Sequence, residues 1–116
     1  MSEQRALFWS LAELAQALQT ATGKPVIFEG DTAPALPYMV LREVADPSVN
    51  DWGGEAYRVG RVQVDSFALK ASEAASLDDT ALTVMEEAGW RRLIGISLPD
   101  PDPAIRRRMS DFTNTH

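Results

Sequence analysis

The stretch 57–69, YRVGRVQVDSFAL, has the pattern of the longest β-strand in the chain. Successive side chains of a strand point to opposite faces of a sheet. Val62, Val64 and Ala68 share one parity, with Ser66 between them, and form an apolar face. The other parity is mostly polar: Arg61, Gln63, Asp65 and Phe67. The strand therefore has one face to bury, and we expect the rest of the chain to cover it.

The beginning of this strand departs from the alternation. Val59 breaks the parity, and Gly60 follows it directly. A β-bulge adds one residue to a strand and restores the alternation, and glycine adopts the backbone angles that a bulge requires. We therefore predict a bulge at Gly60.

A helix is predicted over residues 3–21, before the central strand. Its leucines recur at spacings of four, three and four, which places them on one stripe of a 3.6-residue period: Leu7, Leu11, Leu14 and Leu18. Ser2 is a suitable N-cap, and Gly23 is a suitable C-terminal stop.

A second helix is predicted over residues 73–88, with Ser72 as its N-cap and Gly89 at its end. Glu86 and Glu87 oppose the helix dipole at its C-terminal end, and local helix physics does not explain their position. The apolar face consists of Ala74, Leu77, Ala81, Met85 and Ala88. We predict that the core combines the leucine stripe of the first helix with Val62, Val64, Ala81 and Met85.

Three further strands are expected over residues 25–29, 38–44 and 90–97. The connection 45–56 contains proline, asparagine and glycines, which favours a long, mobile hairpin connection. Trp52 in this connection either packs onto its own domain or serves as an anchor for a partner.

The terminal segment 105–113, IRRRMSDFT, fits both regular patterns poorly. Ile105, Met109 and Phe112 fit one face of a helix, whereas the alternation expected of a strand is weak. The pattern alone therefore favours a helix in this segment.

The composition is that of one compact globular domain over residues 1–116, with 45% hydrophobic residues. The chain has no cysteine, which excludes a disulfide framework and thiolate chemistry. We expect neither a signal peptide nor a membrane span, since no apolar run approaches the ~20 residues that a span needs. The net charge of −6 argues against unassisted binding to the nucleic-acid backbone.

Residues suited to catalysis or metal binding are scarce. The single histidine is His116, at a terminus that is expected to fray, and zinc-type ligand sets are missing. The arginine run 106–108 is expected to be solvated or paired with acids, with phosphate contact as the alternative. Carboxylate pairs occur only where acids are ordinary: Glu29 with Asp31, Asp78 with Asp79, and Asp100 with Asp102. We therefore predict no enzymatic activity, no cofactor and no metal.

The order of these elements resembles the tail-completion and tail-terminator proteins of long-tailed bacteriophages. Residues 26–41 resemble the family's strand, proline loop and Pro-Tyr-aliphatic strand. Residues 61–75 resemble its aliphatic-Gln-aliphatic-Asp strand that runs into a Ser-x-x-Ala helix, and residues 107–112 resemble its closing strand with an Asp-Phe pair. The residues that carry the resemblance are Pro37, Tyr38, Val62, Gln63, Val64, Asp65, Ser72, Ala75, Asp111 and Phe112.

The resemblance implies an α+β fold, in which two helices pack on one face of a mainly antiparallel sheet of about five strands. It also implies that residues 105–113 form a strand, against the pattern reading, and we adopt the strand. In the family, such proteins form a ring, usually of six subunits, at the head-proximal end of the tail tube. Gene-transfer particles and tailocin-like particles use the same part.

The expected function is accordingly that of a structural virion protein, assembled in the cytoplasm of the host bacterium. The expected partners are further copies of the chain, the tail tube protein and the head–tail connector protein, with DNA passing through the lumen without specific binding. We expect subunit contacts in the connection 45–56 and in the terminal segment, at Asp46, Val49, Asp51, Trp52, Arg106 and Arg108.

Two other classes of function remain open on the sequence. One is a small α+β regulatory or ligand-binding domain that acts as a dimer with a shared sheet edge. The other is an enzyme whose site assembles between subunits from aspartate, glutamate and arginine. The mass in solution distinguishes a ring from a tight dimer.

Overall fold

The structure is a computed structural model that describes residues 11–44 and 59–115. The order of elements along the chain is α2 (Leu11–Thr22), β1 (Val26–Phe28), β2 (Tyr38–Val44), β3 (Val59–Ala68), α3 (Ala71–Glu87), β4 (Arg91–Leu98) and β5 (Arg106–Thr115). None of the helices within these ranges is long and apolar enough to cross a membrane. The predicted connection 45–56 and the N-terminal part of the first predicted helix lie outside the described residues.

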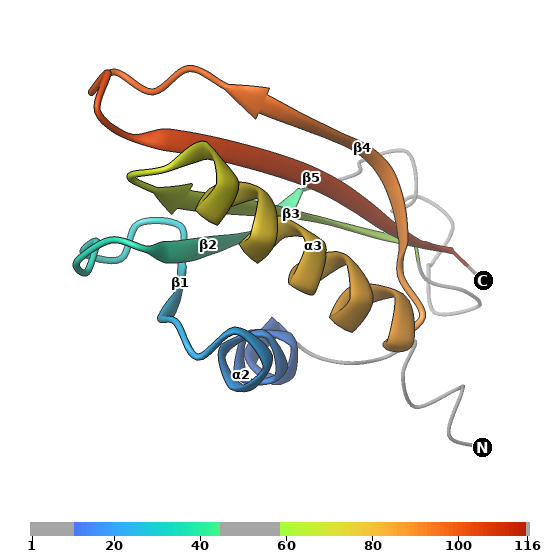
Figure 1. The fold of residues 1–116 in the computed structure, drawn as a ribbon. Coiled ribbons are helices and arrows are strands. Elements are labelled where there is room, and N and C mark those ends of the chain that lie inside the picture. Colours follow the sequence, from blue (N-terminus) through green and yellow to red (C-terminus); the bar gives the residue numbers. More distant parts are fainter. Residues whose placement is uncertain (1–10, 45–58, 116) are drawn as a thin grey trace.

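The strands form one five-stranded sheet in the order β1-β2-β3-β5-β4, and both helices pack on one of its faces (Figure 1). The pairs β2–β3, β3–β5 and β4–β5 are antiparallel, and the short pair β1–β2 is parallel. The predicted α+β class with a mainly antiparallel sheet is thus confirmed. The central strand of the sequence pattern, β3, is also the middle strand of the sheet.

The bulge predicted at Gly60 is wrong. β3 pairs with β5 in one continuous register, with Gly60 opposite Asn114. The glycine instead makes room for an aromatic ring, because a Cβ built at Gly60 would lie 3.3 Å from Cη2 of Trp90. The register shift in this sheet lies on β4, between Arg92 and Ile94.

The terminal segment is strand β5, as the family resemblance implied, and the helix favoured by the pattern is wrong. Arg108, Ser110 and Phe112 alternate along one side of β5, and Ser110 and Phe112 are fully buried. The sequence hides this alternation because two polar residues, Arg108 and Ser110, take inward positions. Both bind the buried carboxylate of Asp78 on α3.

The two helices end where the glycines predicted. Gly23 and Gly89 have φ angles of 70° and 95°, which favour glycine over other residues. The N-terminus of α3 differs from the prediction: Ser72 lies inside the helix, and the N-cap is Lys70, without a side-chain cap hydrogen bond.

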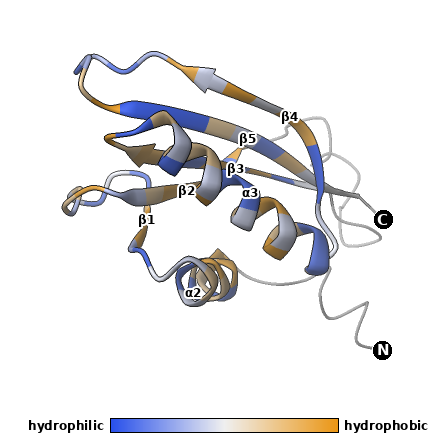
Figure 2. Ribbon diagram, in the orientation of Figure 1, coloured by the Kyte–Doolittle hydropathy of each residue, from blue (hydrophilic) through white to orange (hydrophobic). Residues whose placement is uncertain are grey.

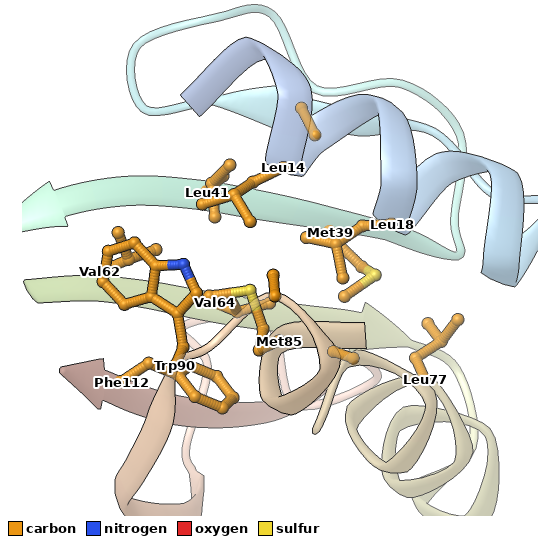
Figure 3. Close-up of a cluster of buried hydrophobic side chains, with 13 residues drawn as sticks. Leu14, Leu18, Met39, Leu41, Val62, Val64, Leu77, Met85, Trp90 and Phe112 are labelled. Atoms are coloured by element: carbon orange, nitrogen blue, oxygen red, sulfur yellow. The ribbon is translucent and has the colours of Figure 1, made fainter. Parts of the chain in front are cut away.

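The core lies between the two helices and the sheet (Figure 3). Leu14 and Leu18 of the predicted leucine stripe are fully buried, Leu11 is partly buried, and Leu7 lies outside the described residues. Trp90 closes the core at the end of α3. The buried side chains that the sequence predicted for the sheet and the second helix are Val62, Val64, Ala81 and Met85.

Candidate interaction surfaces

The face of the sheet opposite the helices combines apolar side chains with charged ones. One row of paired residues crosses all five strands: Ile27, Val40, Asp65, Met109 and Ile96. An antiparallel sheet with one solvated face usually carries polar residues on that face. The neighbouring rows add further apolar side chains: Tyr38, Phe67, Leu98 and Ile94. Ile94 is exposed, and the other apolar side chains of these rows are half-buried.

Asp65 is the polar residue of that row, and a partner in the same chain neutralises its charge. Asp65 is 2% exposed, and its Oδ2 lies 2.6 Å from Nη2 of Arg107. Gln63 donates a second hydrogen bond to Oδ1 over 3.1 Å. The guanidinium of Arg107 lies over the ring of Phe67, which stacks on Tyr38 with 5.0 Å between the ring centroids. A charge-assisted pair and an aromatic stack thus hold the middle of this face in one arrangement.

Two more arginines on this face have carboxylate partners. Arg61 Nη2 lies 3.1 Å from Asp111 Oδ2, and Arg42 Nε lies 3.2 Å from Glu29 Oε2. Burial raises the pKa of the Tyr38 phenol, and the negative charge of Asp100 raises it further, so the phenol is uncharged at neutral pH. A partner on this face therefore meets apolar side chains and charges that are already paired.

Strand β4 forms one edge of the sheet over eight residues. Leu93 and Ile94 on this strand are 47% and 46% exposed. An edge strand presents unpaired backbone groups, and a bulge is one device that protects it from pairing with another chain. The register shift between Arg92 and Ile94 provides such a bulge.

A polar cluster joins α3 to strands β4 and β5 on the side of the sheet that the helices cover. The side chain of Asp78 is fully buried, and its Oδ1 accepts a 2.7 Å hydrogen bond from Ser110 Oγ. Its Oδ2 lies 3.1 Å from Arg108 Nε and 3.5 Å from Arg92 Nη1. The sequence analysis treated Asp78 as one of the acids that are ordinary at a helix start. The missed signal is its position, because Asp78 lies one turn from both Ala74 and Ala81 on the buried face of α3.

A pocket of about 760 Å³ lies where the first turn of α3 meets the turn between β4 and β5. Its walls combine apolar side chains with arginines of β5 and one carboxylate, that of Asp100. Leu69 in the wall is 61% exposed. The lining residues that matter below are Leu69, Lys70, Ala71, Asp100, Ile105 and Arg106.

The structure describes two of the six predicted contact residues. Arg106 and Arg108 lie two residues apart on β5 and both line the pocket. Arg106 is exposed, whereas Arg108 is held by Asp78 and is 30% exposed. The four others, in the connection 45–56, lie outside the described residues: Asp46, Val49, Asp51 and Trp52.

The carboxylate pairs singled out in the sequence have local structural partners. Glu29 pairs with Arg42, and Asp31 accepts a hydrogen bond from the backbone N–H of Phe28. Asp100 and Asp102 each accept one from a backbone N–H two residues further on, in the turn after β4. Within residues 11–44 and 59–115, no three acidic or histidine side chains gather as a metal site.

Comparison with known proteins gives a fold relationship. No family model and no curated protein matches this chain. A solved structure described as the virion of a native gene transfer agent particle contains a chain with a similar fold, at a TM-score of 0.50 and 16% sequence identity. The match covers 98% of this chain and 90% of the other. The two chains therefore share their fold over nearly their whole lengths.

Proposed function

We propose that this chain is a structural virion protein that closes the head-proximal end of a tail tube as a ring of six copies and offers a surface for head joining. The observation that carries the proposal is the fold shared over 98% of this chain with a component of a gene transfer agent virion. The order of motifs in the sequence supports the tail-terminator role within such a particle. In this role the protein works by assembly and performs no reaction.

The described surfaces suit a ring. A closed ring of identical copies requires contacts between two different patches of each copy. The sheet face opposite the helices and the open edge of β4 are candidate patches for contacts with other copies or with the tail tube protein. Both lie on the rigid sheet, so their geometry can be repeated in every copy.

The charge also suits a ring around DNA. Six copies at −6 each carry 6 × −6 = −36 in total. A negative wall repels the phosphate backbone, which lets a duplex pass without adhering. The head–tail connector protein would then meet the ring on the side away from the tube.

The test is deletion of the gene from the genome that encodes its particle, with re-expression from a second copy as the control. Tails of abnormal length, or normal tails that fail to join heads, are the expected result. Electron microscopy of the purified particles distinguishes the two. Normal infectious particles that lack this protein would overturn the proposal.

A further inference from the structure

We propose that neighbouring copies of this chain meet head to tail, with the acidic last turn of α3 in one copy against the basic pocket beside the first turn of α3 in the next. This inference rests on the proposed ring, because it names the two patches that the ring brings together. It explains the two exposed glutamates that helix physics leaves unexplained.

The acidic patch is the last turn of α3. Glu86 and Glu87 are exposed, and the last turn contains no basic residue. Negative charge at this end of a helix is unfavourable, because it adds to the partial negative charge of the free carbonyl groups. Within the described part of the chain, neither glutamate has an ion-pair partner. A cation from outside the subunit would relieve this repulsion.

The basic patch is the pocket at the opposite end of α3. Lys70 and Arg106 line it and are exposed, and neither forms an ion pair with a described residue. The pocket's carboxylate, Asp100, accepts a hydrogen bond from the backbone N–H of Asp102. The first turn of α3 adds its partial positive charge. The exposed side chain of Leu69 supplies apolar area for the contact.

The two patches are complementary and lie at opposite ends of one helix. Figure 2 shows the last turn of α3 and the first part of β5 as hydrophilic regions at the two ends of the molecule. A 17-residue helix is roughly 25 Å long, so the patches cannot meet within one copy. Because each copy carries both patches, a second copy of the chain is the occupant that pairs Glu86 and Glu87 with Lys70 and Arg106 in turn around a ring.

The test exploits the lack of cysteine in the chain. One variant, Ala71→Cys, places a thiol in the pocket wall, and a second, Thr83→Cys, places one on the helix face one turn before Glu87. Both positions are exposed, and neither change removes a charge. The matched control is Ala12→Cys, at an exposed position on α2. The rates of disulfide formation are measured at low ionic strength in mixtures of two single-cysteine variants.

We expect the mixture of Ala71→Cys with Thr83→Cys to cross-link about tenfold faster than the mixture of Ala71→Cys with Ala12→Cys, since opposite charges raise encounter rates. Added salt should remove the difference. Adding Glu86→Lys and Glu87→Lys to the Thr83→Cys chain should also remove the difference in cross-linking rate. Adding Lys70→Glu and Arg106→Glu to the Ala71→Cys chain should then restore the fast rate.

Equal rates in the two mixtures would overturn this contact while leaving a ring built on other surfaces possible. A chain with both cysteines separates the contact from the ring. Its thiols lie roughly 18 Å apart along one helix, too far for a bond within one copy. A ladder of covalent multimers supports head-to-tail assembly. Cross-linking that stops at a two-copy species would keep the contact and contradict the proposed ring.

Discussion

Replacing Asp78 by alanine tests the polar cluster that fastens α3 to the sheet. The fully buried carboxylate receives hydrogen bonds from Ser110, Arg108 and Arg92. Alanine leaves the hydroxyl of Ser110 and one side of each guanidinium without their acceptor. The variant therefore removes the partner of two cations and of one buried donor.

The expected loss of unfolding free energy is about 3 kcal/mol. Breaking a buried ion pair by removing one partner costs roughly 3–5 kcal/mol. The low end applies because the side chains of Arg108 and Arg92 are 30% and 32% exposed and can turn to water. Such a loss is large beside a total stability of about 5–15 kcal/mol for a typical domain.

Urea denaturation followed by circular dichroism measures this loss, provided that the slope with denaturant is unchanged. The control is Asp79→Ala, which removes an exposed acid from the same turn of α3 and should change the stability by less than about 0.5 kcal/mol. Asp78→Asn keeps an acceptor for Ser110 and should lose less than the alanine variant. A loss below about 1 kcal/mol for Asp78→Ala would refute the role given to this cluster.

Four further outcomes are expected. Leu14→Ala should lose about 2–5 kcal/mol in urea denaturation, because the side chain is fully buried; a loss under ~0.5 kcal/mol would contradict the packing of α2. The double variant Glu86→Lys and Glu87→Lys should raise monomer stability by about 0.3–1 kcal/mol per site, and a lower melting temperature would count against the dipole argument. Gly60→Ala should cost about 1–3 kcal/mol, because its Cβ would lie 3.3 Å from a buried indole; wild-type stability would show that the ring moves freely. Ultraviolet titration should give Tyr38 a raised pKa, so the folded state loses stability as the pH rises above the unfolded value of about 10; a normal titration would disprove its burial.

The sequence predicted most elements of the fold because their apolar periodicity is regular. Strand β2 was predicted with its observed bounds, and the leucine stripe placed Leu14 and Leu18 in the core. The prediction failed at positions where a residue far away in the sequence determines the local structure. Ser110 takes an inward position on β5 only because Asp78 lies above it, and Gly60 is required by Trp90. Neither partner can be identified from local pattern.

The candidate sites were less predictable for the same reason. The arginine run 106–108 was predicted to be solvated or paired with acids, but the sequence could not tell which arginine stays unpaired. The structure binds Arg107 to Asp65 and Arg108 to Asp78, and leaves Arg106 exposed. Strand alternation separates Arg107 from its two neighbours by sending it to the opposite face of the sheet. The ion pair that each arginine forms then depends on which acids the fold places on its face of the sheet.

The cluster at Asp78 also determines how force passes through the molecule. The first turn of α3 forms one wall of the pocket, and Asp78 ties that helix to Arg108 in the interior strand β5. β5 is hydrogen-bonded to β3 over ten residue pairs. Tension applied to the first turn of α3 therefore reaches β5, a strand that is paired on both sides, with β3 and with β4. Strand β4 shares this tie, because Arg92 also binds Asp78. The helix, the interior strand and the edge strand are thus held together at one buried carboxylate.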